Sequence, residues 1–237
     1  MARKLRTAPA GIPQHIYRVA RAGLTTLADN EDKATYLEAL MLYANRYDVA
    51  IHAWGMTATQ LQILVTPHTD NGIASMLQAT GRIYAQHFNQ KYSHKGGIWQ
   101  DRYKASLILS DDYLLGVYQY IDRLLFRQDE STEQTLTHSS AQYNMYGIGT
   151  NDLTPHSSYL ALGESSQQCQ QAYHSLCATP LESEQVEQIE KALRMSLALG
   201  DEHFIKRLEN VTGRRLLEGK PGRPRSRTAP EQVKRRA

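Results

Sequence analysis

The chain has 237 residues, of which 41% are hydrophobic and 22% charged. This composition excludes a chain that is disordered throughout and allows a sizeable buried core. No apolar run approaches the roughly 20 residues that cross a bilayer, so we expect no membrane partner. The two cysteines, Cys169 and Cys177, have neither metal-site nor redox-motif spacing, which excludes a disulfide scaffold and indicates a cytoplasmic protein.

Charge is concentrated at the two ends of the chain. The net charge is +3, but residues 1–21 carry five basic and no acidic groups, and residues 214–237 carry nine basic and two acidic groups. The body between them therefore has a net charge of −9. Cationic chain ends are typical of arms that bind nucleic acid, although a solubilising tail has the same composition.

Residues 1–127 alternate between strand-like and helix-like patterns of apolar residues. The predicted elements, in chain order, are a strand at 15–22, a helix at 31–47, strands at 48–56 and 59–66, a helix that follows Asn71 and carries apolar positions from 73 to 88, a strand at 99–109 and a helix from 111 to about 127. The order β-α-β-β-α-β-α predicts an α+β domain over 1–127, with a ferredoxin-like antiparallel sheet and helices on one face.

Beyond residue 127 the composition becomes polar. Residues 128–157 are rich in Ser, Thr, Gln and Asn and are predicted to be a loop or linker. Residues 158–213 are predicted to be a helical extension, with helices at 166–176, 182–199 and 201–212. The last two helices would form an αα-hairpin, which fits either an extension packed on the core or a helix-turn-helix.

Two features could carry chemistry. On the strand at 59–66, Gln60 and Gln62 share one face, while the apolar residues at 61, 63 and 65 face the core. A paired polar face of this kind is either a binding site or a solvated surface. Tyr120 lies on the helix at 111–127, where a tyrosine packs in a core unless a neighbouring base or a metal turns its phenol into a nucleophile.

Several short stretches together resemble the REP-associated tyrosine transposases, relatives of the single-tyrosine transposases of small bacterial insertion sequences. These stretches are IHAWGM, QILVTP, GRIYAQHFNQKYS, GIWQDRYKASLI, DDYLLGVYQYID, LTPHSSYLALG and KPGRPR. The resemblance implies a bacterial protein with an HUH endonuclease-type fold that acts on single-stranded DNA beside a hairpin. It also implies cleavage by a tyrosine that forms a 5′-phosphotyrosine link, while a divalent ion such as Mg²⁺ polarises the phosphate.

The sequence departs from this family at the residues that hold the ion. In the family these are two strand histidines and a side chain one helical turn after the tyrosine. Tyr120 aligns with the nucleophile, but the ligand positions align with Gln60, Gln62 and Leu124. A neutral amide oxygen is a poor substitute for imidazole, and leucine has no donor atom. The resemblance therefore implies a degenerate site with no metal or other cofactor, and a vestigial Tyr120.

Basic residues at positions that face DNA in the family are kept, which implies that binding is retained without cleavage. Residues 221–225 also resemble a minor-groove hook, although a flexible basic tail over 214–237 explains them equally well. The predicted DNA-binding residues are Arg3, Lys4, Arg6, Arg18, Arg21, Arg82, Arg102 and Lys104, with Lys220, Arg223 and Arg225 in the tail.

Three functions fit these observations. The first is a nucleoid-associated DNA-binding protein that recognises hairpin-forming or single-stranded DNA and whose strand cleavage is lost or impaired. The second is an active transposase in which His15, His52 or Asp122 supplies ligands to the ion. The third is a folded relic without a selected function. The sequence favours neither a monomer nor a homodimer.

Overall fold

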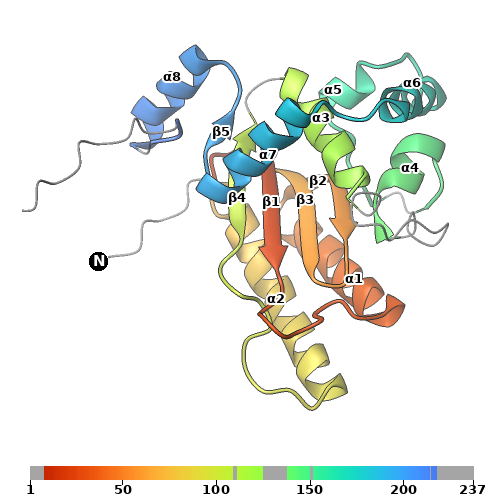
Figure 1. The fold of residues 1–237 in the computed structure, drawn as a ribbon, viewed down its shortest axis with the longest axis vertical. Helices are drawn as coiled ribbons and strands as arrows, with labels where there is room; N and C mark the ends of the chain where they lie inside the picture. Colours follow the sequence, from red (N-terminus) through yellow and green to blue (C-terminus); the bar gives the residue numbers. More distant parts are fainter. Residues whose placement is uncertain (1–7, 109–110, 125–137, 150–151, 214, 218–237) are drawn as a thin grey trace, which may run out of the picture.

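A five-stranded sheet forms the centre of the protein (Figure 1). The computed structural model describes residues 8–108, 111–124, 138–149, 152–213 and 215–217. The sheet has the order β2-β3-β1-β4-β5; the first four strands pair antiparallel, and β5 runs parallel to β4. The strands are β1 (Gln14–Val19), β2 (Val49–Met56), β3 (Gln60–Pro67), β4 (Lys104–Ile108) and β5 (Ala198–Leu199). The predicted α+β class with a ferredoxin-like sheet is confirmed.

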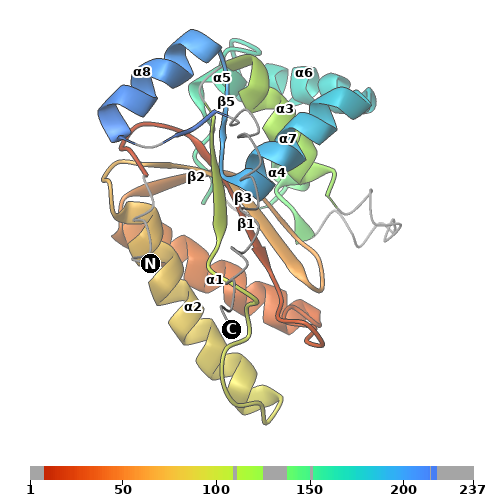
Figure 2. The same ribbon diagram turned by 60° about the vertical axis from the view of Figure 1, so that its left-hand side comes forward.

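Two long helices, α1 (Asn30–Arg46) and α2 (Gly72–Lys91), cover one face of the sheet (Figure 2). α1 begins with a capping box between Asp29 and Asp32, which satisfies backbone N–H groups at the start of the helix. Asn71 stands at the start of α2 but makes no capping bond with its side chain. Alternate residues of β3 are fully buried in the core formed with these helices, as predicted; they are Leu61, Ile63 and Val65.

The opposite face of the sheet is covered as well, which corrects the expectation of helices on one face. α3 (Asp111–Asp122) and α7 (Ser183–Met195) pack on it (Figures 1 and 2). This face is also apolar, because Ala53, Leu64 and Ile108 are buried there in a second core. An apolar sheet face is stable only when another layer removes it from water.

Part of the predicted linker is a structured layer against the edge strand β2. It contains α4 (Ala141–Tyr146) and leads into α5 (Ser157–Leu160). The Ser140 N–H donates to the Trp54 carbonyl, and the Thr154 N–H donates to the Ile51 carbonyl. The prediction of a loop over 128–157 is therefore wrong for this part, because backbone groups of an edge strand need partners. Residues 125–137 lie outside the described residues.

The C-terminal extension contains α6 (Ser166–Ala178), α7 and α8 (Glu202–Thr212). The helix predicted over 182–199 ends at Met195, where Ser196 has a left-handed backbone with φ 53°. The chain then forms β5 on the edge of β4, so α7 and α8 do not make the predicted αα-hairpin. Asp201 caps α8 as expected, since its side chain accepts a hydrogen bond from the His203 N–H.

The remaining differences concern the ends of elements. The strand predicted over 15–22 ends at Val19. The strand predicted over 99–109 begins its regular pairing at Lys104, while Trp99 makes only an isolated bridge with Ala20. α3 ends at Asp122 rather than near 127. Within the described ranges, no helix is long and apolar enough to cross a membrane.

Candidate functional site

The register of the sheet places three polar side chains in one row beneath α3 and α7. Tyr17 of β1 stands opposite Gln62 of β3 on one side and Lys104 of β4 on the other. Opposite residues in antiparallel strands project from the same face, and so do residues two apart. Gln60 therefore points to this face as well, as the alternation in the sequence predicted.

α3 brings Tyr120 over this row, and the turn that follows α3 brings Leu124 there. In this turn the Leu124 N–H donates to the Ile121 carbonyl. α3 approaches β2 closely at Gly55, where a Cβ atom would stand 2.9 Å from the Ile121 carbonyl oxygen and 3.4 Å from a Leu124 methyl group. A side chain at position 55 would push α3 away, so this glycine allows Leu124 to reach the strands.

These side chains surround a pocket of about 410 Å³, so the structure brings together the four positions that the sequence singled out. α7 closes the pocket with residues that sequence reasoning missed, because nothing in residues 183–195 indicates where that helix packs. The lining consists of Tyr17, Gln60, Gln62, Lys104, Tyr120, Leu124, Glu190, Leu193 and Arg194.

A chain of contacts links the polar groups of the pocket. Gln62 Oε1 lies 2.8 Å from His15 Nε2, and the His15 ring packs edge-on against Tyr120 with 5.7 Å between ring centroids. The Tyr120 hydroxyl donates to Glu190 Oε1 over 3.2 Å. Tyr120 and Gln62 are only 4% and 3% exposed. Tyr120 therefore serves as a packed residue that also joins α3 to α7.

The side chains of this pocket do not fit a divalent ion. The Gln62 carbonyl oxygen is already engaged by His15, and Leu124 offers only carbon. Amide oxygens are weak ligands for the metals that imidazoles hold. Across the ranges that the structure describes, no group of three or more His, Cys, Asp or Glu residues could hold a metal ion.

The alternative ligands named from the sequence are not brought together. His15 lies behind the pocket, in contact with Gln62 and Tyr120 of its lining. His52 is buried on β2, where its ring nitrogens contact the Thr154 carbonyl and the Thr66 hydroxyl. Burial lowers the pKa of His52 to about 4. Asp122 points into the second core, where three donors bind its carboxylate and burial raises its pKa to about 6. The donors are Ser140, Asn144 and Tyr173.

Among the predicted DNA-binding residues that fall within the described ranges, Lys104 is the one that lines the pocket. Arg18 lies on the other face of the sheet, with its guanidinium 4.4 Å from the centre of the Trp99 ring. Arg21, Arg82 and Arg102 are exposed. The six in the terminal segments lie outside the described residues; they are Arg3, Lys4, Arg6, Lys220, Arg223 and Arg225.

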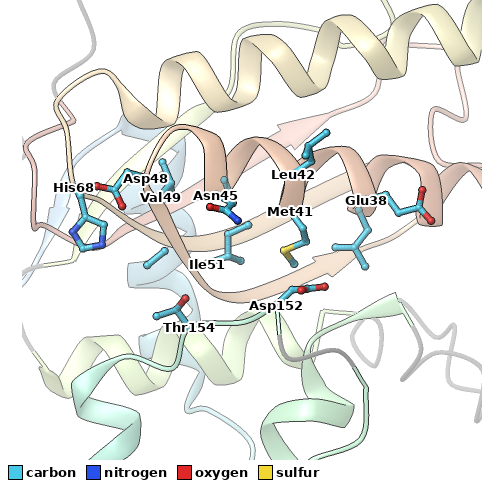
Figure 3. Close-up of a pocket in the computed structure, with 13 residues that line it drawn as sticks. Glu38, Met41, Leu42, Asn45, Asp48, Val49, Ile51, His68, Asp152 and Thr154 are labelled. Atoms are coloured by element: carbon cyan, nitrogen blue, oxygen red, sulfur yellow. The ribbon is translucent and has the colours of Figure 1, made fainter.

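A larger cavity of about 700 Å³ lies between α1, the edge of β2 and residues 152–154 (Figure 3). Its lining combines apolar residues such as Met41 with the carboxylates of Glu38, Asp48 and Asp152. It contains none of the residues that the sequence singled out. Carboxylates repel phosphate, so this cavity does not suit a nucleic acid backbone.

Comparison with known proteins gives one family model that matches part of the chain and several similar solved structures. The model of the family described as "Transposase IS200 like" matches residues 15–123. The solved structure of a REP-associated tyrosine transposase bound to a REP hairpin is similar, with a TM-score of 0.49 and 15% identity, over 66% of this chain and 93% of that chain. A candidate transposase from Deinococcus radiodurans R1 is similar with a TM-score of 0.36 and 18% identity, over 52% of this chain and 97% of that chain. No curated protein matches the sequence.

Proposed function

We propose, from the match of residues 15–123 to the model of the IS200-like transposase family, that the protein binds hairpin-forming or single-stranded DNA and has lost strand cleavage. On this proposal it resides on the bacterial nucleoid and needs no metal ion.

One observation carries the proposed loss of cleavage. Gln60, Gln62 and Leu124 stand around Tyr120 in one pocket, where the family that the sequence resembles places the ligands of its ion. Even the loss of a residue that only supports a metal ligand typically costs about 10–100-fold in affinity or activity. Loss of three direct ligands removes the means of polarising a phosphodiester beside Tyr120.

The distribution of charge supports DNA binding. The two chain ends carry +5 and +7, whereas the body carries −9. Contacts with phosphates supply most of the sequence-independent affinity for nucleic acid. Lys104 and Arg194 in the pocket lining add two cations on the face of the sheet that carries Tyr120.

The proposal predicts that the purified protein forms no covalent adduct with a labelled hairpin oligonucleotide that has single-stranded flanks, whether Mg²⁺, Mn²⁺ or EDTA is present. Tyr120→Phe should change the DNA dissociation constant by less than about fivefold, since one hydrogen bond contributes roughly 1 kcal/mol or less. Denaturing gels measure the adduct, and fluorescence anisotropy measures affinity. An adduct that forms in the parent and disappears in Tyr120→Phe would instead establish the active transposase.

Removal of the basic tail should reduce the salt dependence of binding. For single strands, the logarithm of the binding constant falls with the logarithm of salt concentration by about 0.7 per neutralised phosphate. Deletion of residues 220–237 should therefore flatten this slope in anisotropy titrations. A full-length variant with the seven Lys and Arg residues of this segment changed to Gln separates the effect of charge from that of length. An unchanged slope in both variants would show that the tail does not contact DNA.

A further inference from the structure

We propose that the larger cavity, between α1, the edge of β2 and residues 152–154, holds the basic segment 1–7 of the same chain, and that DNA displaces this segment. The docking goes beyond the proposed function, whereas the competition with DNA rests on it. The body of the protein would then hold one of its two cationic chain ends until DNA binds that end.

Three carboxylates of the cavity are exposed and have no ion-pair partner among the described residues. They belong to Glu38, Asp48 and Asp152. At the start of α1, by contrast, Lys91 forms ion pairs with three carboxylates. Like charges that share one cavity repel each other, and a cationic ligand removes this repulsion. The cavity therefore suits a ligand with several positive charges.

Apolar side chains of the cavity are also left in contact with water. Leu42 in the lining is 64% exposed, the highest value among the large apolar side chains that the structure describes. Figure 3 shows Met41 between Glu38 at one end of the cavity and Asp48 at the other. Removal of apolar surface from water is favourable. A matching ligand therefore carries an apolar side chain between its positive charges.

Residues 1–7 have this composition. They contain Arg3, Lys4 and Arg6, no acidic residue, and Leu5 between two of the cations. Their charge is opposite to that of the cavity and to the net charge of −9 on the body of the chain. Opposite charges attract each other over about 8–10 Å at physiological salt. The segment is therefore drawn to the cavity, provided that the cavity lies within its reach.

The described chain begins beside one end of the cavity. Ala8 is buried in the core with α1 and α2, and the Gly11 N–H donates to the Pro67 carbonyl over 2.7 Å. The next residue, His68, donates its N–H to the Asp48 carbonyl, and both of these residues line the cavity. Gly11 therefore lies two interstrand spacings, or about 10 Å, from the Asp48 end of the cavity.

The length of the segment matches the length of the cavity. Along α1 the lining extends from Leu37 to Asn45, which corresponds to about 12 Å of helix. Seven extended residues span up to about 24 Å. About 12 Å therefore remain for the approach from Ala8, which is as much as two interstrand spacings require. The segment can lie along the cavity and bring its cations to both ends.

The test uses the full-length protein with cysteines introduced in pairs and a short bismaleimide cross-linker. Cys169 and Cys177 are buried, which shields them from the reagent. Ala2→Cys and Leu42→Cys should be linked within one molecule at least about tenfold faster than Ala2→Cys and Leu176→Cys, because docking raises the effective concentration of one thiol at the other. Leu176 is a matched control, since it is an exposed leucine of α6, which packs in the second core. Mass spectrometry of protein digests measures the link.

Loss of the charge in the cavity should slow this reaction. Glu38→Gln with Asp152→Asn, added to the first cysteine pair, should lower the rate at least about twofold, since each exposed ion pair contributes only a little. Glu164→Gln with Glu187→Gln removes the same charge from exposed positions outside the cavity and should leave the rate unchanged. A saturating amount of the hairpin oligonucleotide should slow the reaction of the first cysteine pair.

Equal rates for the two cysteine pairs overturn the docking, and so does a rate that survives the loss of both cavity carboxylates. A covalent dimer would show that the cavity takes the segment of a second copy, and a fast link from Ser226→Cys to Leu42→Cys without one from Ala2→Cys would assign it to the C-terminal tail. Both results overturn the inference. A hairpin that binds without slowing the link overturns the competition alone. A hairpin that does not bind overturns the proposed function and leaves the docking intact.

Discussion

Changing Gln60 and Gln62 to His, together with Leu124→Asn, should produce a protein that binds a divalent ion and forms a covalent adduct with DNA through Tyr120. The strand pair needs no backbone movement, because residues two apart already share a face. Residue 124 already lines the pocket with them. The loss of a residue that only supports a metal ligand lowers metal affinity by about 10–100-fold. Because three direct ligands are restored here, we expect the affinity for the ion to rise by more than about 100-fold. Calorimetry with Mn²⁺ measures it.

The variants with Gln60→His alone and Leu124→Asn alone serve as controls, and neither should bind more metal than the parent. Leu124 is 3% exposed, so the folding of each variant needs to be verified by thermal unfolding. If the folded triple variant binds no more metal than the parent, the three positions are not the former ligand positions. The proposed cause of inactivity would then be wrong. Metal binding without an adduct would place a further defect outside the ligands.

Asp122 should make the stability of the protein depend on pH between about 4 and 7. Burial raises its pKa from the ordinary 3.8 to about 6, so the folded state favours the protonated carboxyl. The contribution of Asp122 is therefore fully present below pH 3.8 and is lost as the pH rises through about 6. A difference of roughly two pH units corresponds to a change on the order of 3 kcal/mol in the free energy of unfolding.

Urea unfolding of the parent and of Asp122→Asn, at a series of pH values, measures this change. The variant keeps the shape of the side chain but cannot titrate, and its amide nitrogen faces donors from Ser140, Asn144 and Tyr173. We expect the variant to be less stable than the parent at pH 4 and to lack the pH dependence that Asp122 gives the parent. The difference between the two proteins should therefore shrink as the pH rises. Two curves that run parallel from pH 4 to pH 7 would show that Asp122 keeps its ordinary pKa.

Patterns over a few residues were sufficient to predict helices and strands, and to predict which pairs of site residues share a face within one of them. The alternation along β3 predicted that Leu61, Ile63 and Val65 would be buried, and they are. It also paired Gln60 with Gln62, just as helical spacing paired Tyr120 with Leu124. Such pairs can be read from sequence because the direction of a side chain follows from the backbone period of its own element.

Arg18 shows where the same rule places a residue that the resemblance named. Ile16 and Arg18 alternate onto one face of β1, and Ile16 is fully buried in the core with α1 and α2. Arg18 therefore lies over Trp99 on that face, away from the Tyr120 pocket. The resemblance named it as a DNA-binding residue, and the register of β1 with β3 places it on the sheet face opposite to that of Gln62.

The sequence by itself thus determined the α+β class, the order of the first elements and the two faces of each strand. Only the tertiary structure decided what covers them. Glu190, 70 residues from Tyr120, closes the pocket, the edge of β4 draws residues 198–199 out of a helical pattern, and residues 139–140, just before α4, pair with β2. Intrinsic helix and strand preferences differ by only about 1 kcal/mol per residue. Burying an apolar face or pairing a free strand edge contributes more free energy than these preferences. Which faces and edges remain uncovered depends on the whole chain.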